Sequence, residues 1–255
     1  MSSLAASSIA FGCVFGGALL GMFLRSVLPE HHLNADSKDV VKLGMGLIAT
    51  MSALVLALLI ASAKGSYDTQ RNEVTQMSAD IVQLDRVLVH YGPQAKPARG
   101  LERDVVIAGI ALIWSERTFQ TGELNSRAMK DKSARFFEEI QQLTPQNDYQ
   151  RSLMGQALQI SADLGHIRSL LLEQTGGSIP MPFLVVLVFW LSMIFASFGL
   201  FAPVNLSVIA ILLVCAVSVA GAIFLVLELD QPFAGLIRIS DEPMRRALAI
   251  LGQQQ

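Results

Sequence analysis

The fold of this chain is decided by one long apolar stretch, PFLVVLVFWLSMIFASFGLFAPVNLSVIAILLVCAVSVAGAIFLVL, at residues 182–227. It lies in a segment, residues 174–227, that contains no charged side chain. A helix needs about 20 apolar residues to cross a bilayer, so the stretch is long enough for two crossings. Glycine, proline and asparagine within residues 199–205 favour a tight turn between them. We therefore predict two membrane spans, at about 182–200 and 206–227.

Two earlier stretches have the same character. No charged side chain occurs in residues 1–24 or 43–63, which predicts two more spans at about 4–23 and 43–63. The whole chain is 52% hydrophobic and only 16% charged, whereas soluble domains carry about 25% charged residues. The sequence therefore predicts an all-α integral membrane protein with four transmembrane helices.

The segment between the second and third spans is polar but has a helical pattern. Apolar residues recur every three or four positions, which is typical of packed helices. Breaks are predicted at Gly92-Pro93, Thr121-Gly122 and Thr144-Pro145, and they divide the segment into four helices of a bundle. The predicted organisation is a transmembrane hairpin (1–63), a four-helix insert (64–178), a second hairpin (179–229) and a C-terminal segment with a short helix (230–255).

The distribution of basic residues predicts the orientation. With four spans, both termini and the insert lie on one side of the membrane. That side carries six basic residues near the membrane, Lys64, Arg71, Arg168, Arg238, Arg245 and Arg246, and the other side carries three, Arg25, Lys38 and Lys42. The positive-inside rule then places the insert and both termini in the cytoplasm.

Small residues line two of the predicted spans. The second span has an alanine stripe at Ala49, Ala53, Ala57 and Ala61, and the first has two glycine pairs at the same spacing, Gly12 with Gly16 and Gly17 with Gly21. Such stripes let helices approach closely in lipid. The alanine stripe serves packing within the chain, an interface between subunits around a common axis, or both, because a subunit in a ring uses two faces. In the second case, Thr50 and Ser52 are candidates to line a pore.

An acidic motif follows the fourth span. It comprises Glu228, Asp230, Pro232, Phe233 and Gly235, and is followed by Arg238. In a structural interpretation, Asp230 caps a turn, Phe233 anchors at the membrane interface and Gly235 permits a bend. In a functional interpretation, the two carboxylates form an acidic ring at the cytoplasmic mouth of an oligomer, or pair with Arg238. A short helix with acidic residues at its start is predicted beyond the motif, at 244–251.

This ending, together with LGMGLIATMSALVL at residues 43–56, resembles the bacterial bestrophin-like family. The resemblance covers nearly the whole chain. It implies a multi-pass protein of the bacterial inner membrane with four spans and a helical insert between the second and third. Bestrophins are pentameric anion channels, so the resemblance also implies a homo-oligomer, with inorganic ions as the conducted species. The aromatic, proline-containing neck motif of true bestrophins is absent from the second span, where the alanine stripe stands instead.

The sequence narrows the functions further. A net charge of −2 gives no basic field for nucleic acid, and we find no catalytic, phosphate-binding, cofactor or paired metal-ligand motif. We therefore expect neither an enzyme nor a cofactor. Two functions remain: an oligomeric ion channel with the second span near its axis, or a membrane-anchored interaction or sensory module whose bundle binds a partner without conduction.

Overall fold

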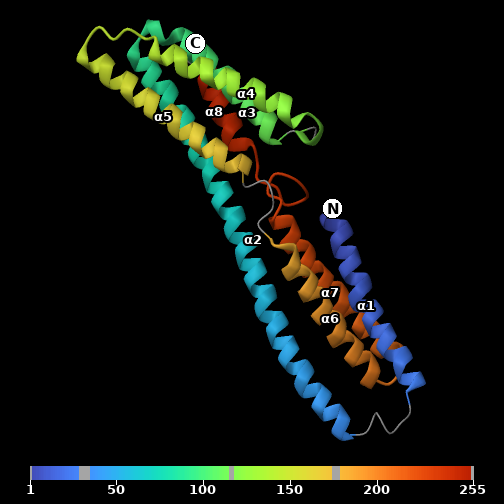
Figure 1. Ribbon diagram of the computed structural model, residues 1–255. Coiled ribbons are helices and arrows are strands. Elements are labelled where there is room, and N and C mark those ends of the chain that lie inside the picture. The colour runs from blue at the N-terminus through green and yellow to red at the C-terminus, as the bar shows by residue number, and fades with distance from the viewer. Residues whose placement is uncertain (1, 29–34, 115–117, 174–178, 254–255) are drawn as a thin grey trace. The chain divides into compact units, whose positions relative to one another are not determined.

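A computed structural model describes residues 2–28, 35–114, 118–173 and 179–253, and the side chains at 35–37, 118–126 and 252–253 fall outside this description. The described residues form helices and connecting turns, without strands. Four helices are long and apolar enough to cross a membrane: α1 (Ser3–Val27), α2 (Ala35–Tyr91), α6 (Met181–Phe201) and α7 (Leu206–Leu229) (Figure 1). Each overlaps one predicted span, so the prediction of four spanning helices agrees with the structure.

The chain divides into two compact units. The membrane unit comprises Met1–Tyr67 and Gly177–Gln231, and the bundle unit comprises Asp68–Gly176 and Pro232–Gln255. Helix α2 belongs to both units: its residues up to Tyr67 are part of the membrane unit, and those from Asp68 are part of the bundle unit.

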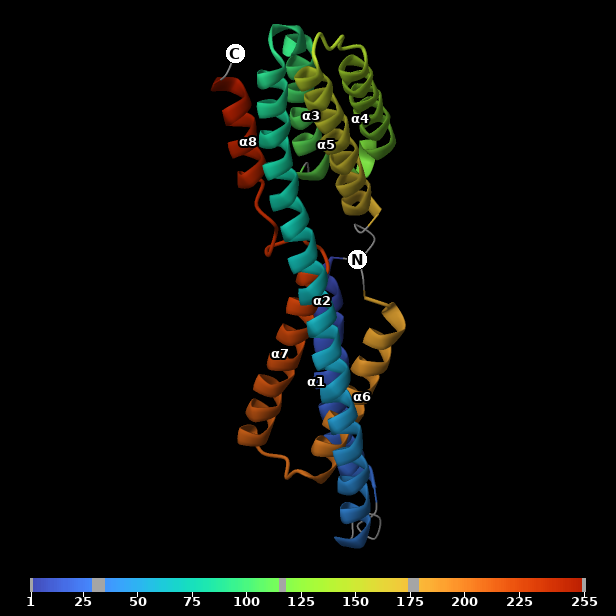
Figure 2. The same ribbon diagram turned by 90° about the vertical axis from the view of Figure 1, so that its left-hand side faces the viewer.

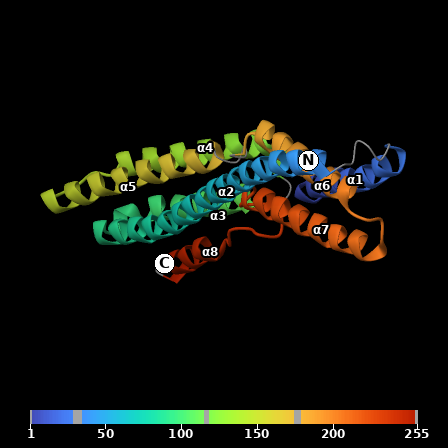
Figure 3. The same ribbon diagram turned by 90° about the horizontal axis from the view of Figure 1, so that it is seen from below.

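Backbone contact between α1 and α6 organises the membrane unit. A Cβ atom added to Gly21 would lie 2.0 Å from the carbonyl oxygen of Ala196, and one added to Gly199 would lie 2.0 Å from that of Ala18. The two helices therefore lie side by side with only glycine at their closest points (Figures 1 and 3). The close packing expected of the Gly17–Gly21 pair is confirmed, whereas Gly12 and Gly16 have no such neighbour within 4 Å.

Helix α7 completes the core of the membrane unit against α1. Its Leu212 and Ala216 pack with Val14, Ala18 and Phe195. The turn between α6 and α7 agrees with the one predicted within residues 199–205, because Asn205 caps α7 by accepting a hydrogen bond from the Val208 N–H at 2.9 Å.

Helix α2 is continuous over 57 residues. The second predicted span therefore has no break after it, and Gly65 lies inside the helix. The helix ends at Tyr91, where Gly92 has a φ of 116° and the 3₁₀ turn η2 (Pro93–Ala95) follows. This break is where the sequence predicts it.

The bundle unit adds α3 (Lys96–Trp114), α4 (Thr118–Gln141) and α5 (Asp148–Glu173) to the end of α2 (Figure 2). Large apolar side chains from these helices form its core: Leu84, Leu88, Tyr91, Phe136 and Ile140. Figures 2 and 3 show α4 and α5 running alongside each other.

One predicted helix boundary in the bundle is wrong. Helix α4 begins at Thr118 and continues through Thr121-Gly122, because a single glycine costs a helix only about 1 kcal/mol. The break predicted at Thr144-Pro145 agrees with the structure: α5 begins after it at Asp148, where Asn147 provides the cap and its side chain accepts a hydrogen bond from the Gln150 N–H at 2.8 Å.

The C-terminal helix α8 (Glu242–Gln253) packs into the bundle unit. Its side chains at Met244, Ala247 and Leu251 are at most 3% exposed, and Ser78 of α2 donates a hydrogen bond to the Pro243 carbonyl oxygen at 2.7 Å. The helix itself is predicted from the sequence, but it is assigned there to a C-terminal segment separate from the helical bundle. The spacing of these three residues is the signal that it has a packed face.

Candidate functional site

The alanine stripe of α2 is the first candidate surface. All four alanines, Ala49, Ala53, Ala57 and Ala61, are exposed in the single chain. The buried face of this part of α2 is a different one, with Leu59 and Ala63 packed against α6 and α7 at Leu187 and Val226. The interpretation of the stripe as packing within the chain is therefore wrong, since that packing uses Leu59 and Ala63.

Helix α2 is also the least buried of the four spans. Only 11% of its most apolar window is buried within the chain, compared with 33% for α1, 28% for α6 and 22% for α7. Large apolar residues are exposed beside the stripe, among them Leu47, Leu54 and Leu58. This surface is left for lipid or for another protein chain.

The two predicted pore-lining hydroxyls lie on different faces of α2. Thr50 is exposed near the alanine stripe, and its Oγ1 donates a hydrogen bond to the Leu47 carbonyl oxygen at 2.7 Å. Ser52 is 3% exposed and lies on the packed side. Of the two, Thr50 therefore shares the exposed surface.

The acidic residues of the C-terminal motif lie at the end of α7. Glu228 is buried at 4% exposure, and Asp230 is the half-buried C-cap residue. The Asp230 backbone N–H donates to the Val226 carbonyl oxygen at 3.2 Å, so this residue closes the last turn of the helix. Their placement at a helix end fits the capping interpretation, and the acidic ring stays a prediction.

The rest of the motif folds as a loop of the bundle unit. The Ile239 N–H donates to the Pro232 carbonyl oxygen at 2.7 Å, and Gly235 has a φ of 82°, so it supplies the expected bend. The Phe233 ring meets Trp114 edge-on at 5.7 Å between centroids. Phe233, predicted in the structural interpretation to anchor at the membrane interface, therefore contacts the Trp114 side chain. Arg238 is exposed.

Trp114 makes a second contact with this loop, through a hydrogen bond. Its indole Nε1–H donates to the Ile239 carbonyl oxygen at 2.8 Å. The loop between α7 and α8 is therefore held on the end of α3 by one ring contact and one hydrogen bond.

The bundle unit contains buried charges that the sequence analysis does not single out. Asp85 of α2 is 1% exposed and accepts a hydrogen bond from Arg99 Nε of α3 at 2.7 Å. Glu102, one turn further along α3, is 2% exposed. Burial raises the pKa of Glu102 well above its ordinary value, the charge of Asp85 raises it further, and Arg99 opposes the shift.

The position of Asp85 carries the signal that could have predicted this group. It adjoins Leu84 in the apolar seam of α2, so a helical projection places it at the edge of the buried face. Among the described residues, no group of three or more His, Cys, Asp or Glu side chains is placed to hold a metal ion.

The family model of the bestrophin-like domain matches residues 12–244 of this chain. The chain belongs to the bestrophin-like family. Its fold is similar to the crystal structure of a bacterial bestrophin homologue from Klebsiella pneumoniae that carries a point mutation, with a TM-score of 0.64 and 14% sequence identity. That match covers 94% of this chain and 98% of the homologue. A search of curated proteins finds no sequence match.

Proposed function

We propose that this bestrophin-like chain is one subunit of an oligomeric ion channel in the bacterial inner membrane. The observation that carries the proposal is the exposed apolar surface of α2, where the alanine stripe faces away from the rest of the chain. Small residues at this spacing favour close helix contact in lipid. The α2 helix of a second subunit has the shape and hydropathy needed to pack against this exposed surface.

Several copies of α2 around an axis would enclose the pore. A single subunit has four spans, and three of them, α1, α6 and α7, are packed on one another. Thr50 would then be the polar group closest to the alanine contacts, among apolar residues that could close the pore by dewetting. The family resemblance favours five subunits.

The distribution of basic residues supports the orientation proposed for the bundle. Six basic residues on the side of the termini against three on the other side favour a cytoplasmic bundle unit and cytoplasmic termini. The bundle unit, which includes the helical insert between the second and third spans, would then form the cytoplasmic part of the channel.

Two features point to opposite ion selectivities. The family resemblance favours anions, whereas a ring of Glu228 and Asp230 carboxylates would favour cations. We propose anion conduction, with these carboxylates engaged at the helix end instead of exposed to the pore, in accordance with the burial of Glu228. Reversal potentials in liposomes under a KCl gradient distinguish the two.

The first experiment is the mass of the protein in detergent, measured by light scattering with correction for bound detergent. We expect a closed oligomer of about five subunits, followed by ion flux in liposomes. A monomer or dimer in both detergent and lipid nanodiscs would contradict the channel and favour the membrane-anchored interaction module. Flux equal to that of empty liposomes, alongside a working control channel, would also contradict it.

Matched variants on α2 test the interface itself. Ala53→Leu and Ala57→Leu enlarge the stripe and should shift the protein to smaller species, because overpacking separates the helices. Met51→Ala, at an exposed position on the other side of the same helix from Ala49 and Ala53, is the control and should leave the mass unchanged. Equal effects of all three variants would show that the stripe is not the contact surface.

A further inference from the structure

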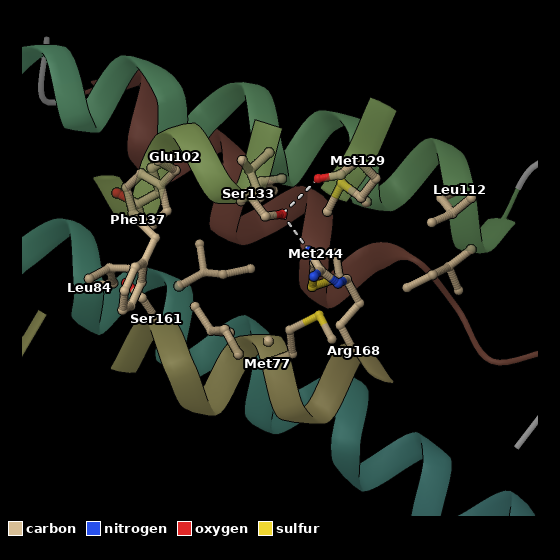
Figure 4. A pocket seen from close by; sticks show the side chains of 18 residues that line it. Met77, Leu84, Glu102, Leu112, Met129, Ser133, Phe137, Ser161, Arg168 and Met244 are labelled. Atoms are coloured by element: carbon tan, nitrogen blue, oxygen red, sulfur yellow. Dashed lines mark hydrogen bonds between the residues drawn. The ribbon is translucent and has the colours of Figure 1, made fainter. Parts of the chain in front are cut away.

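The bundle unit contains a partly open cavity of about 100 Å³ that the proposed channel function does not use. An engineered apolar cavity of about 150 Å³ holds benzene, so this smaller space suits a ligand of only a few non-hydrogen atoms. Its walls are mostly apolar and come from five helices, and Met77, Met129 and Met244 contribute flexible side chains that adapt to a ligand (Figure 4).

Arg168 of α5 supplies one cationic group to this cavity. Its guanidinium donates a hydrogen bond to the Ser133 hydroxyl, and Figure 4 shows it beside Met244. Among the described residues no carboxylate lies within ion-pair distance of it. Burial lowers the pKa of Arg168, because its charge is partly desolvated. An incoming anion would stabilise it.

Glu102 lies elsewhere in the cavity wall, and Figure 4 draws it well away from Arg168. Neither of its carboxyl oxygens has a hydrogen-bond partner among the described residues. Its raised pKa favours the neutral acid, so this part of the wall carries no full negative charge to repel an anion.

Two serine hydroxyls in the cavity wall already donate hydrogen bonds within their own helices. Ser133 donates to the Met129 carbonyl oxygen at 2.9 Å, and Ser161 donates to that of Ala157 at 2.7 Å. Among the described residues that line the cavity, Arg168 is the single cationic side chain and most of the others are apolar, which is the pattern of a site for a monoanion with a hydrocarbon body.

We propose that this cavity binds a small aliphatic monocarboxylate, with its carboxylate paired to Arg168 and its hydrocarbon chain among the methionines. A bidentate pair with the guanidinium would fix the orientation of the ligand. The proposal is independent of ion conduction.

The cavity is lined by helices that are connected along the sequence to helices of the membrane unit. Met77 lies on α2, which continues into the second span, and Met244 lies on α8, which follows the loop after α7. Arg168 lies on α5, which precedes α6 in the sequence, so a bound carboxylate would contact all three helices of the bundle unit that are connected to membrane helices, which suits a regulatory ligand.

The test uses the full-length chain in a non-ionic detergent, titrated by saturation-transfer NMR with butyrate, 1-butanol and butylammonium. These probes share a chain and differ in charge. We expect saturable binding of butyrate, binding of 1-butanol about tenfold weaker or less, and no binding of butylammonium. Equal binding of butyrate and 1-butanol, or no butyrate binding at tens of millimolar, would overturn the proposal.

Matched variants on α5 locate the binding. Arg168→Gln should weaken butyrate about tenfold or more and Arg168→Lys should retain part of the affinity, whereas Arg151→Gln, at an exposed ion pair on the same helix, should not change it. Equal affinities of Arg168→Gln and Arg151→Gln would overturn the proposal.

A second pair of variants does not depend on Arg168. Gly165 lines the cavity and has open space at its Cβ position, so Gly165→Leu should fill the cavity and abolish binding. Gly155→Leu is the control, at an exposed glycine of α5 with similar space. Undiminished butyrate binding by a folded Gly165→Leu protein would place the ligand elsewhere and overturn the assignment.

Discussion

In the membrane unit, α1 and α6 approach so closely that a Cβ at Gly21 would lie 2.0 Å from the Ala196 oxygen, whereas in the bundle unit the helices are separated by large side chains such as Tyr91 and Phe136. The first arrangement depends on the absence of side chains at a few points. The second depends on filling a wider space, and it leaves a cavity. In lipid, apolar side chains gain little by leaving the solvent, so shape and backbone proximity carry more of the packing there.

The two units also treat polar groups differently. Within the spans, the hydroxyls of Ser192 and Ser218 donate to carbonyl oxygens of their own helices, four residues back. In the bundle, Asp85 and Arg99 form a buried ion pair between two helices. The comparison indicates that contacts between helices are specified by close fit in the membrane unit and partly by charge in the bundle.

The largest expected effect comes from breaking the buried ion pair. Arg99→Gln leaves the Asp85 carboxylate buried without its cation, which should lower the free energy of unfolding by about 3–5 kcal/mol. Arg151→Gln removes an exposed pair with Asp148 and should cost about 0–1 kcal/mol. Thermal unfolding followed by circular dichroism measures both, and similar losses would show that charge does not specify the bundle.

The next largest effect concerns the glycine contact. Gly21→Ala forces α1 and α6 apart and should cost about 1–3 kcal/mol, the usual range for overpacking. Gly12→Ala adds the same methyl group to the same helix where no atom lies within 4 Å, and should be nearly neutral. The fraction of monodisperse protein and its unfolding temperature are the readouts. A Gly21→Ala protein as stable as Gly12→Ala would contradict close backbone packing.

The third effect is the pH dependence of the bundle. Because the pKa of Glu102 is raised in the folded state, its contribution to stability is greatest below the unfolded value, near 4.5, and is lost as pH rises toward the raised pKa. Glu102→Gln stays neutral, so its unfolding temperature should fall less steeply than the wild type above pH 4.5. Glu138→Gln, at an exposed carboxylate of α4, should follow the wild type. Parallel curves for all three proteins would exclude Glu102 as the group that titrates.

The spans could be predicted from sequence because membrane insertion depends on local composition. Lengths and charge-free stretches locate all four spanning helices, and Asn205 marks the turn between α6 and α7. The direction that each stripe faces could not be predicted in the same way. Gly21 and Ala53 both belong to small-residue stripes, yet the first packs within the chain and the second is exposed, because that choice depends on which neighbour a helix meets.

The candidate sites show a similar division. The bend at Gly235 could be predicted because a left-handed φ favours glycine at a single position. The cavity near Arg168 and the carboxyl of Glu102 could not, since they arise where five helices meet. In the sequence, Arg168 and Glu102 look like ordinary charged residues of a helix. Their burial becomes evident only from the packing of the whole bundle unit.

The smallest expected effect tests the acidic end of α7 and rests on the proposed channel. Asp230→Asn removes one carboxylate from each subunit at the end of the spans. Because we propose that these carboxylates are engaged at the helix end, we expect the reversal potential under a KCl gradient to stay unchanged. A shift toward chloride with an unchanged oligomer mass would instead indicate a ring of carboxylates that faces the pore. Glu228→Gln should instead act mainly on stability, because Glu228 is 4% exposed and more deeply buried than Asp230. An Asp230→Asn protein with an unaltered reversal potential and a lowered unfolding temperature would identify the motif as a helix cap, and selectivity would then have to arise on the exposed face of α2.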